Sequence, residues 1–162
     1  MNNHWQDETA KQLPKGAFLM VCDNPMTIGW AQFGILWGKL CATVYVRHSR
    51  YTHELLEKTN TFTISVPKYG SMQKELTFCG TKSGRDVNKL EALGLSVLTP
   101  SFGAQNGIKG CKYQIECHIL HRSELDESRI ENQELTRRYY ANGDPHTMYI
   151  GEILGVTEAE NI

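Results

Sequence analysis

The sequence predicts a mainly β fold, an antiparallel barrel or sandwich with short helices at its periphery. Several short segments are rich in β-branched and aromatic residues, as strands are. The segments of helical periodicity between them are too short and too few for a regular alternation of strand and helix. No repeat, linker or low-complexity tract divides the 162 residues, so we expect one domain over residues 1–162.

The expected strands are apolar or alternating runs. Residues 17–22, 40–46 and 61–66 are short and rich in β-branched or aromatic residues, which is typical of strands, and the first is expected to be buried. Residues 113–121 alternate, so that Tyr113 and Ile115 share one face with the next odd-numbered residues, which indicates a strand with one face toward the core. Residues 147–156 form the last expected strand.

The expected helices cover residues 52–58, 72–79, 86–93 and 132–140. The third has a defined start and stop. Asp86 is expected to cap its first turn, and Gly94 provides a left-handed exit after an apolar face that ends at Leu93.

Composition excludes several classes of protein. The chain has 17 Lys and Arg against 18 Asp and Glu, a balance that excludes a fully disordered chain and argues against a nucleic-acid partner. No segment approaches the roughly 18 apolar residues of a membrane span, and the N-terminus is acidic where a secretory signal is basic. We therefore expect a cytoplasmic protein whose partners are small molecules or proteins.

Five cysteines, an odd number without a C-x-x-C pair, indicate reduced thiols rather than a disulfide framework. Three of them, Cys22, Cys41 and Cys117, lie in apolar runs and are expected to be small core residues.

Nucleotide and metal motifs are weak. Gly29 and Gly34 have the spacing of a P-loop, but Ile35 follows where lysine is needed, and no G-x-G-x-x-G occurs. Cys117 and His118 would point to opposite faces of a strand, so we expect no metal site. The acidic residues of segment 124–131 are expected to form a solvated surface.

Three loops, residues 24–30, 47–52 and 79–86, combine hydroxyl groups, cations and main-chain amides. The last two stand at the threshold of expected helices. A phosphate monoester needs such donors, and helix N-termini supply amides with a positive dipole end. The residues alone leave two interpretations open: a phosphate cradle, or ordinary capped turns with basic residues on the surface.

The order of four motifs resembles a known family. They are Asn24-x-Met26-Thr27, Arg50-Tyr51-Thr52, Cys79-Gly80-x-x-Ser83-Gly84-Arg85-Asp86-Val87-x-Lys89, and His146 ahead of Ile150-Gly151-Glu152. Over nearly the whole chain the sequence is similar to the flavin reductase-like proteins of the FMN-binding split-barrel fold, which include flavoredoxins. The resemblance implies an antiparallel, Greek-key-like split β-barrel with short peripheral helices.

The resemblance also implies a cofactor, FMN, and the residues that bind it. The ring would be lined by Met26, Thr27, Ile28, Gly29 and Trp30, and the phosphate would be held by Arg47, Ser49, Arg50, Thr52, Ser83, Gly84 and Lys89. His146 either contacts the flavin edge or lies in a surface turn. Trp30 and Trp37 make this turn region unusually aromatic, and they either restrict access to the ring or pack in a core or interface. A homodimer is implied as well.

The implied function is an FMN-dependent oxidoreductase, an NAD(P)H-dependent flavin reductase that passes electrons from the nicotinamide through FMN to an acceptor. Two alternatives share the same contacts: a flavoredoxin-type carrier that exchanges electrons with a protein partner, and a flavin-binding module without turnover. The sequence does not distinguish among these three functions, and it does not show whether NADH or NADPH is the electron donor.

Overall fold

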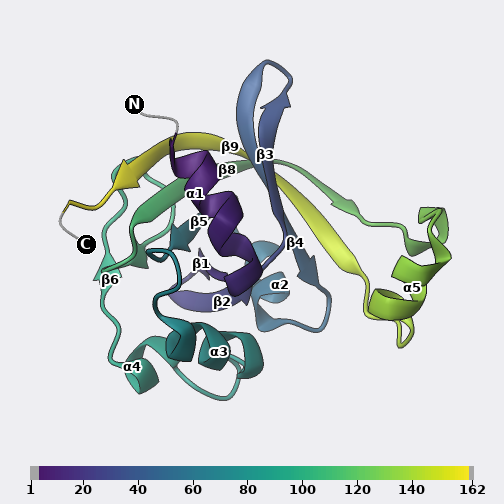
Figure 1. Cartoon of the computed structure of the whole chain (residues 1–162), viewed down its shortest axis with the longest axis horizontal. Helices are drawn as coiled ribbons and strands as arrows, with labels where there is room; N and C mark the ends of the chain where they lie inside the picture. Colours follow the sequence, from purple (N-terminus) through teal and green to yellow (C-terminus); the bar gives the residue numbers. More distant parts are fainter. Residues whose placement is uncertain (1–3, 161–162) are drawn as a thin grey trace.

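An antiparallel seven-stranded sheet forms the centre of the molecule in the computed structural model, which describes residues 4–160 (Figure 1). The strand order is β2-β1-β5-β8-β9-β4-β3. These strands are β1 (Ala17–Val21), β2 (Asn24–Ile28), β3 (Ala31–Leu36), β4 (Lys39–Arg47), β5 (Thr61–Val66), β8 (Tyr113–Glu124) and β9 (His146–Glu158), and β6 (Val97–Leu98) pairs separately with β7 (Gly107–Ile108).

The sheet curls into an incomplete barrel. Its edge strands, β2 and β3, are separated in the chain only by Gly29 and Trp30, so the two edges must approach each other there. Inside, apolar side chains of β1, β2, β4, β5, β8 and β9 form one buried cluster, against which Phe33 of β3 also packs. The prediction of a mainly β, antiparallel architecture is therefore confirmed.

Short helices surround the barrel, as predicted. They are α1 (His4–Gln12), α2 (Tyr51–Leu56), α3 (Gln73–Thr81), α4 (Lys89–Leu93) and α5 (Gln133–Tyr140), with 3-10 turns η1 (Leu13–Lys15) and η2 (Glu127–Arg129). A second apolar cluster joins Phe18 and Met20 of β1 to Leu76 and Cys79 of α3. Figure 1 shows α5 at the far end of the long excursion between β8 and β9, and the β3–β4 hairpin projecting from the body. Within residues 4–160, no helix has the length and apolar character that crossing a membrane requires.

The loop expected at residues 24–30 is mostly strand β2. It pairs with β1 from Ala17↔Ile28 to Val21↔Asn24, because Cys22 and Asp23 both adopt positive φ, 50° and 57°, and close a two-residue hairpin. Cys22 is consequently exposed, and the expectation that it is a core residue is wrong. Cys41 and Cys117 are buried as expected.

Helix α4 begins later than predicted. Its cap is Asn88, whose side chain accepts a hydrogen bond from the Glu91 amide at 3.1 Å, and not Asp86. Asp86 lies in a preceding turn, where its main-chain N–H donates a hydrogen bond to the carbonyl oxygen of Ser83 at 3.1 Å. The left-handed exit at Gly94, with φ of 65°, is confirmed.

Candidate functional site

Two adjoining cavities open where β2, the β4–α2 loop and the α3–α4 segment meet. The first, here called the aromatic cavity, has a volume of about 240 Å³ and is lined by Met26, Thr27, Ile28, Gly29, Trp30, Tyr45, Arg47, Arg50, Tyr139 and His146. The second, here called the cationic cavity, has a volume of about 210 Å³ and is lined by Asn24, Ser49, Arg50, Tyr51, Thr52, Thr81, Lys82, Ser83, Gly84, Arg85 and Lys89. Arg50 lines both, so the two cavities meet at its side chain.

The aromatic cavity lies between strand β2 and a wall of rings. The Trp30 ring stands edge-on to Tyr139, with centroids 5.1 Å apart, and its centroid is also 5.1 Å from that of His146. His146 is buried, and its Nδ1 is hydrogen-bonded to the Tyr140 hydroxyl at 2.8 Å. Of the two alternatives for this histidine, the structure excludes the surface turn.

His146 is held in its neutral form. Burial, reinforced by the positive charge of Arg47, lowers the pKa of His146 to about 4. At neutral pH the cavity therefore presents an uncharged imidazole beside the guanidinium groups of Arg47 and Arg50.

We expect the free energy of unfolding to fall as the pH decreases from about 6.5 to about 4. In the unfolded chain His146 takes up a proton near its ordinary pKa of 6.5, whereas the folded ring does so only near 4, so acid favours the unfolded chain in this interval. Urea unfolding across this range should show a smaller pH dependence for His146→Gln than for the parent protein. Equal pH dependence in both proteins would contradict the assignment.

Arg47 anchors the helix that carries the aromatic wall. Its guanidinium donates hydrogen bonds to the main-chain oxygens of Tyr139 at 2.8 Å and Asp144 at 2.7 Å, and it lies 5.2 Å from the centroid of the Tyr140 ring. These bonds tie α5 and the following loop to the end of β4. Arg47 thus lines the aromatic cavity and not the cationic cavity, which the six other residues expected around a phosphate line.

A buried ammonium group lies at the inner end of the cationic cavity. Lys89 is only 3% exposed, and its Nζ donates to the carbonyl oxygens of Pro25 at 2.9 Å and Cys79 at 3.0 Å. Burial lowers the pKa of Lys89 to about 8, so the group is still mostly charged at neutral pH. An ammonium group has three N–H donors, and the described part of the chain supplies acceptors for two of them.

Arg50 reaches the same place from the loop after β4. It donates to the carbonyl oxygen of Gly80 at 3.1 Å and, more weakly, to that of Cys79 at 3.5 Å. Burial lowers the pKa of Arg50 below its ordinary value. Both cations therefore meet at the last turn of α3, where the negative end of the helix dipole offsets their mutual repulsion.

Gly84 is required by the close approach of its loop to β2. A Cβ atom at this position would lie 2.1 Å from Oδ1 of Asn24 and 2.8 Å from the Tyr51 ring. Asn24 is buried and donates to the hydroxyl of Thr52 at 3.2 Å. The missing side chain thus allows the loop to pack directly against Asn24 and Tyr51, and all three residues line the cationic cavity together with Thr52.

The remaining predicted residues have partners within the chain. Ser49 donates from its amide and hydroxyl to the Asp144 carboxylate, at 3.0 Å and 2.5 Å. The Ser83 hydroxyl accepts from the Arg85 amide at 3.1 Å. Arg85 itself pairs with Glu54 at 2.6 Å at the rim of the cavity.

Comparison with known proteins assigns the chain to a family. The family model described as "Flavin reductase like domain" matches residues 5–162. The chain belongs to the flavin reductase-like family. Two archaeal relatives described as uncharacterized, from Archaeoglobus fulgidus and Pyrococcus abyssi, are each 30% identical over 137 residues. The matches cover 85% of this chain and, respectively, 66% and 67% of those proteins, so the chain spans about two thirds of their length.

Solved structures show the fold of this flavin reductase-like chain. Flavoredoxins from Methanosarcina acetivorans and Desulfovibrio vulgaris (Miyazaki F) each match with a TM-score of 0.70 at 22% identity, over 90% of this chain and 68% and 69% of theirs. An NADH:FAD oxidoreductase from Streptomyces globisporus matches with a TM-score of 0.64 at 18% identity, over 89% of this chain and 74% of its own. The predicted family and the predicted split-barrel fold are both confirmed.

The site of this flavin reductase-like chain includes residues that sequence reasoning missed. Tyr45 on β4 and Tyr139 on α5 line the aromatic cavity, but neither belongs to a loop with an anion-binding pattern. Tyr139 lies more than a hundred positions from β2, and the hydrogen bond from Arg47 and the Trp30 ring hold it beside the cavity. No local signal in the sequence identifies it.

Proposed function

We propose that this protein binds FMN and is an NAD(P)H-dependent flavin reductase, which passes electrons from a nicotinamide through the flavin to an acceptor. One observation carries the proposal: the aromatic cavity and the cationic cavity meet at Arg50. Together they offer one site that is ring-lined at one end and positively charged at the other. FMN has the same polarity, a flat aromatic ring system at one end and a phosphate at the other.

The cationic cavity fits a phosphate. Lys89 keeps one N–H donor without an acceptor in the described residues, and it is buried, so a phosphate oxygen there would form a charge-assisted hydrogen bond. Arg50 adds a second cation. Thr52, Ser83 and Gly84 line the same cavity, where hydroxyl and main-chain groups would add polar contacts to a phosphate.

The aromatic cavity fits the ring. Residues 26–29 line the cavity together with the rings of Trp30 and Tyr139, whose centroids are 5.1 Å apart. Arg47 and Arg50 place positive charge beside the ring, where it favours a negatively charged reduced flavin, while neutral His146 adds no further charge. A bound flavin supplies hydride and one-electron chemistry, so the chain needs only to position it and tune its surroundings.

The absorption spectrum of the purified protein tests this proposal. Flavin bands, with mass spectrometry of the released ligand giving FMN, would support it. A colourless protein that also fails to take up added FMN would overturn it. Anaerobic mixing with NADH or NADPH then tests turnover: rapid bleaching supports a reductase, whereas a flavin inert to both but reducible by dithionite supports the flavoredoxin-type carrier.

We further propose that the protein is a homodimer whose interface includes the flavin site. The tip of the β3–β4 hairpin projects from the body (Figure 1), and its Ile35 and Trp37 are 71% and 62% exposed. Trp30, beside the aromatic cavity, is 42% exposed. Covering these side chains would remove apolar surface from water.

We expect light scattering at micromolar concentration to give about twice the monomer mass of 18.4 kDa. Trp37→Ser should shift the equilibrium toward the monomer. A monomeric parent protein that retains stoichiometric FMN would contradict the proposed interface.

A further inference from the structure

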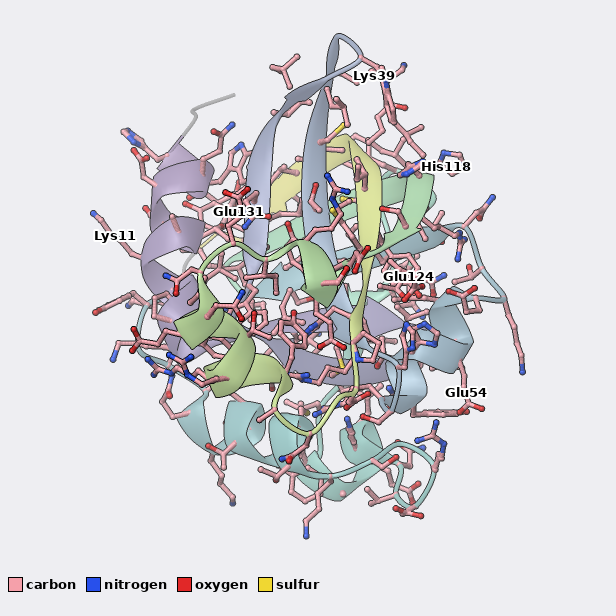
Figure 2. The ribbon with its side chains drawn as sticks, turned by 90° about the vertical axis from the view of Figure 1, so that its right-hand side faces the viewer. Lys11, Lys39, Glu54, His118, Glu124 and Glu131 are labelled. Atoms are coloured by element: carbon pink, nitrogen blue, oxygen red, sulfur yellow. The ribbon has the colours of Figure 1, made fainter. Side chains whose placement is uncertain are left out.

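Two histidines and a glutamate from three separate elements converge outside the two cavities. His48 lies in the loop after β4, His53 lies in α2, and Glu124 ends β8. One side-chain nitrogen or oxygen from each lies within 4.8 Å of the others. Figure 2 shows Glu124 beside the α2 ribbon, whereas His118 lies toward the β3–β4 hairpin. The two histidines are near each other in the sequence, but Glu124 is 76 positions from His48, so the fold produces the convergence.

The Thr147 hydroxyl lies at the centre of this cluster. It donates to Oε1 of Glu124 at 2.8 Å, and it is 3.1 Å from Nε2 of His48 and 2.9 Å from Nε2 of His53. Nε2 of His48 also contacts the second carboxylate oxygen of Glu124. Both imidazoles therefore turn the same nitrogen toward one point, with ring centroids 4.7 Å apart.

The cluster is distinct from the proposed flavin site. Thr147 directly follows His146 on β9, and successive side chains of a strand point to opposite faces. His146 lines the aromatic cavity, whereas none of the three convergent residues lines either cavity. The cluster thus lies behind the cavity wall, with His48 one residue from Arg47.

We propose that His48, His53 and Glu124 form a binding site for a zinc ion. Two imidazole nitrogens and one carboxylate oxygen are a ligand set that zinc accepts, with water in the fourth position. Imidazole nitrogen also disfavours magnesium and calcium, which prefer oxygen ligands.

The spacing fits with small side-chain rotations. Zinc–ligand distances of about 2.0–2.2 Å place tetrahedral ligand atoms about 3.3–3.6 Å apart. The three atoms already lie within 4.8 Å, and the His48 and Glu124 side chains, 39% and 58% exposed, are free to rotate toward the ion. Thr147 is a positioning residue, because its hydroxyl holds one carboxylate oxygen and orients the Glu124 side chain.

Zinc titration of the full chain without a polyhistidine tag, in competition with a chromophoric chelator, tests the site. We expect one zinc per chain and weaker binding by at least about 100-fold in His48→Ala and in His53→Ala, since changes in outer-shell partners alone cost 10–100-fold. Glu124→Gln, which keeps an oxygen for the Thr147 hydrogen bond but loses the charged ligand, should also weaken binding. Magnesium should not compete.

Matched controls locate the binding. His118→Ala removes a histidine elsewhere on β8, and Cys22→Ser removes an exposed thiol. Both variants should bind zinc as the parent does, and circular dichroism should show that every variant is folded. Absence of zinc binding by the parent protein, or parent-like binding by both His48→Ala and His53→Ala, would show that the cluster is held only by its hydrogen bonds and would overturn the proposal.

Discussion

Replacing Lys89 by methionine is expected to lower the affinity for FMN by about 10–150-fold and to leave the affinity for riboflavin unchanged. Methionine keeps most of the length of the buried side chain but removes its charge and its donors. Hydrogen bonds to a charged group contribute roughly 1.5–3 kcal/mol each, which corresponds to that loss of affinity. Riboflavin lacks the phosphate, and Lys89 lines only the cationic cavity, so riboflavin is the matched ligand.

Two further variants define the comparison. Arg50→Ala should weaken the binding of both ligands, because Arg50 lines both cavities. The loss should be larger for FMN, because only FMN has a phosphate for the guanidinium to bind. Arg129→Ala, in the exposed turn η2, should change neither. Calorimetric titration with both ligands measures these affinities. Equal losses for FMN and riboflavin in Lys89→Met would mean that Lys89 supports the fold or the ring, and the phosphate assignment would be wrong.

Gly84→Ala is expected to destabilise the protein by about 1–3 kcal/mol and to weaken FMN binding. The new Cβ would lie 2.1 Å from Oδ1 of Asn24, so Asn24 must move and its hydrogen bond to Thr52 must lengthen or break. Asn24 and Tyr51, the residues that the new methyl group would displace, line the cationic cavity, so its shape would change and FMN would bind less tightly. Urea unfolding and FMN titration measure the two effects.

Gly34→Ala is the matched control for this variant. Gly34 lies on β3, has no atom within 4 Å of an added Cβ, and does not have a positive φ. Its replacement should leave both stability and FMN affinity unchanged. If Gly84→Ala behaved like Gly34→Ala, the loop around residue 84 would have to be free to move away from β2, contrary to the packing described above.

The strands were predictable where the signal is local. Residues 61–66 form β5 with the predicted bounds, because a short run rich in β-branched and aromatic residues indicates a strand without knowledge of its neighbours. Strand β2 was missed because its existence depends on the hairpin at Cys22 and Asp23, which lacks the usual Asn-Gly or Asp-Gly signal. The cap of α4 was misplaced because Asp86 and Asn88 are both suitable cap residues, and only three-dimensional packing selects Asn88.

The residues of the candidate site likewise fall into those that the sequence indicates and those that only the fold brings together. Ser83, Gly84 and Lys89 lie in one segment, and the family resemblance points to them directly. Tyr139 and the convergence of His48 with Glu124 depend on how the β8–β9 excursion folds back, which a single sequence does not reveal. Burial of Lys89 was equally invisible, because a lysine in a polar loop is normally solvated.

One wall of the aromatic cavity, the one that carries Tyr139, lies outside the barrel strands and is attached to them through the hydrogen bonds of Arg47. Residues 125–145 leave the barrel from β8 and return at β9, and both strands continue their pairing without them. An exchange of this excursion, with the two main-chain carbonyls that Arg47 grips retained, would remodel the approach to the cavity and leave the barrel's core unchanged. For protein engineering, residues 125–145 are the place to change which molecules reach the aromatic cavity, because changes there do not require the strands of the barrel to repack.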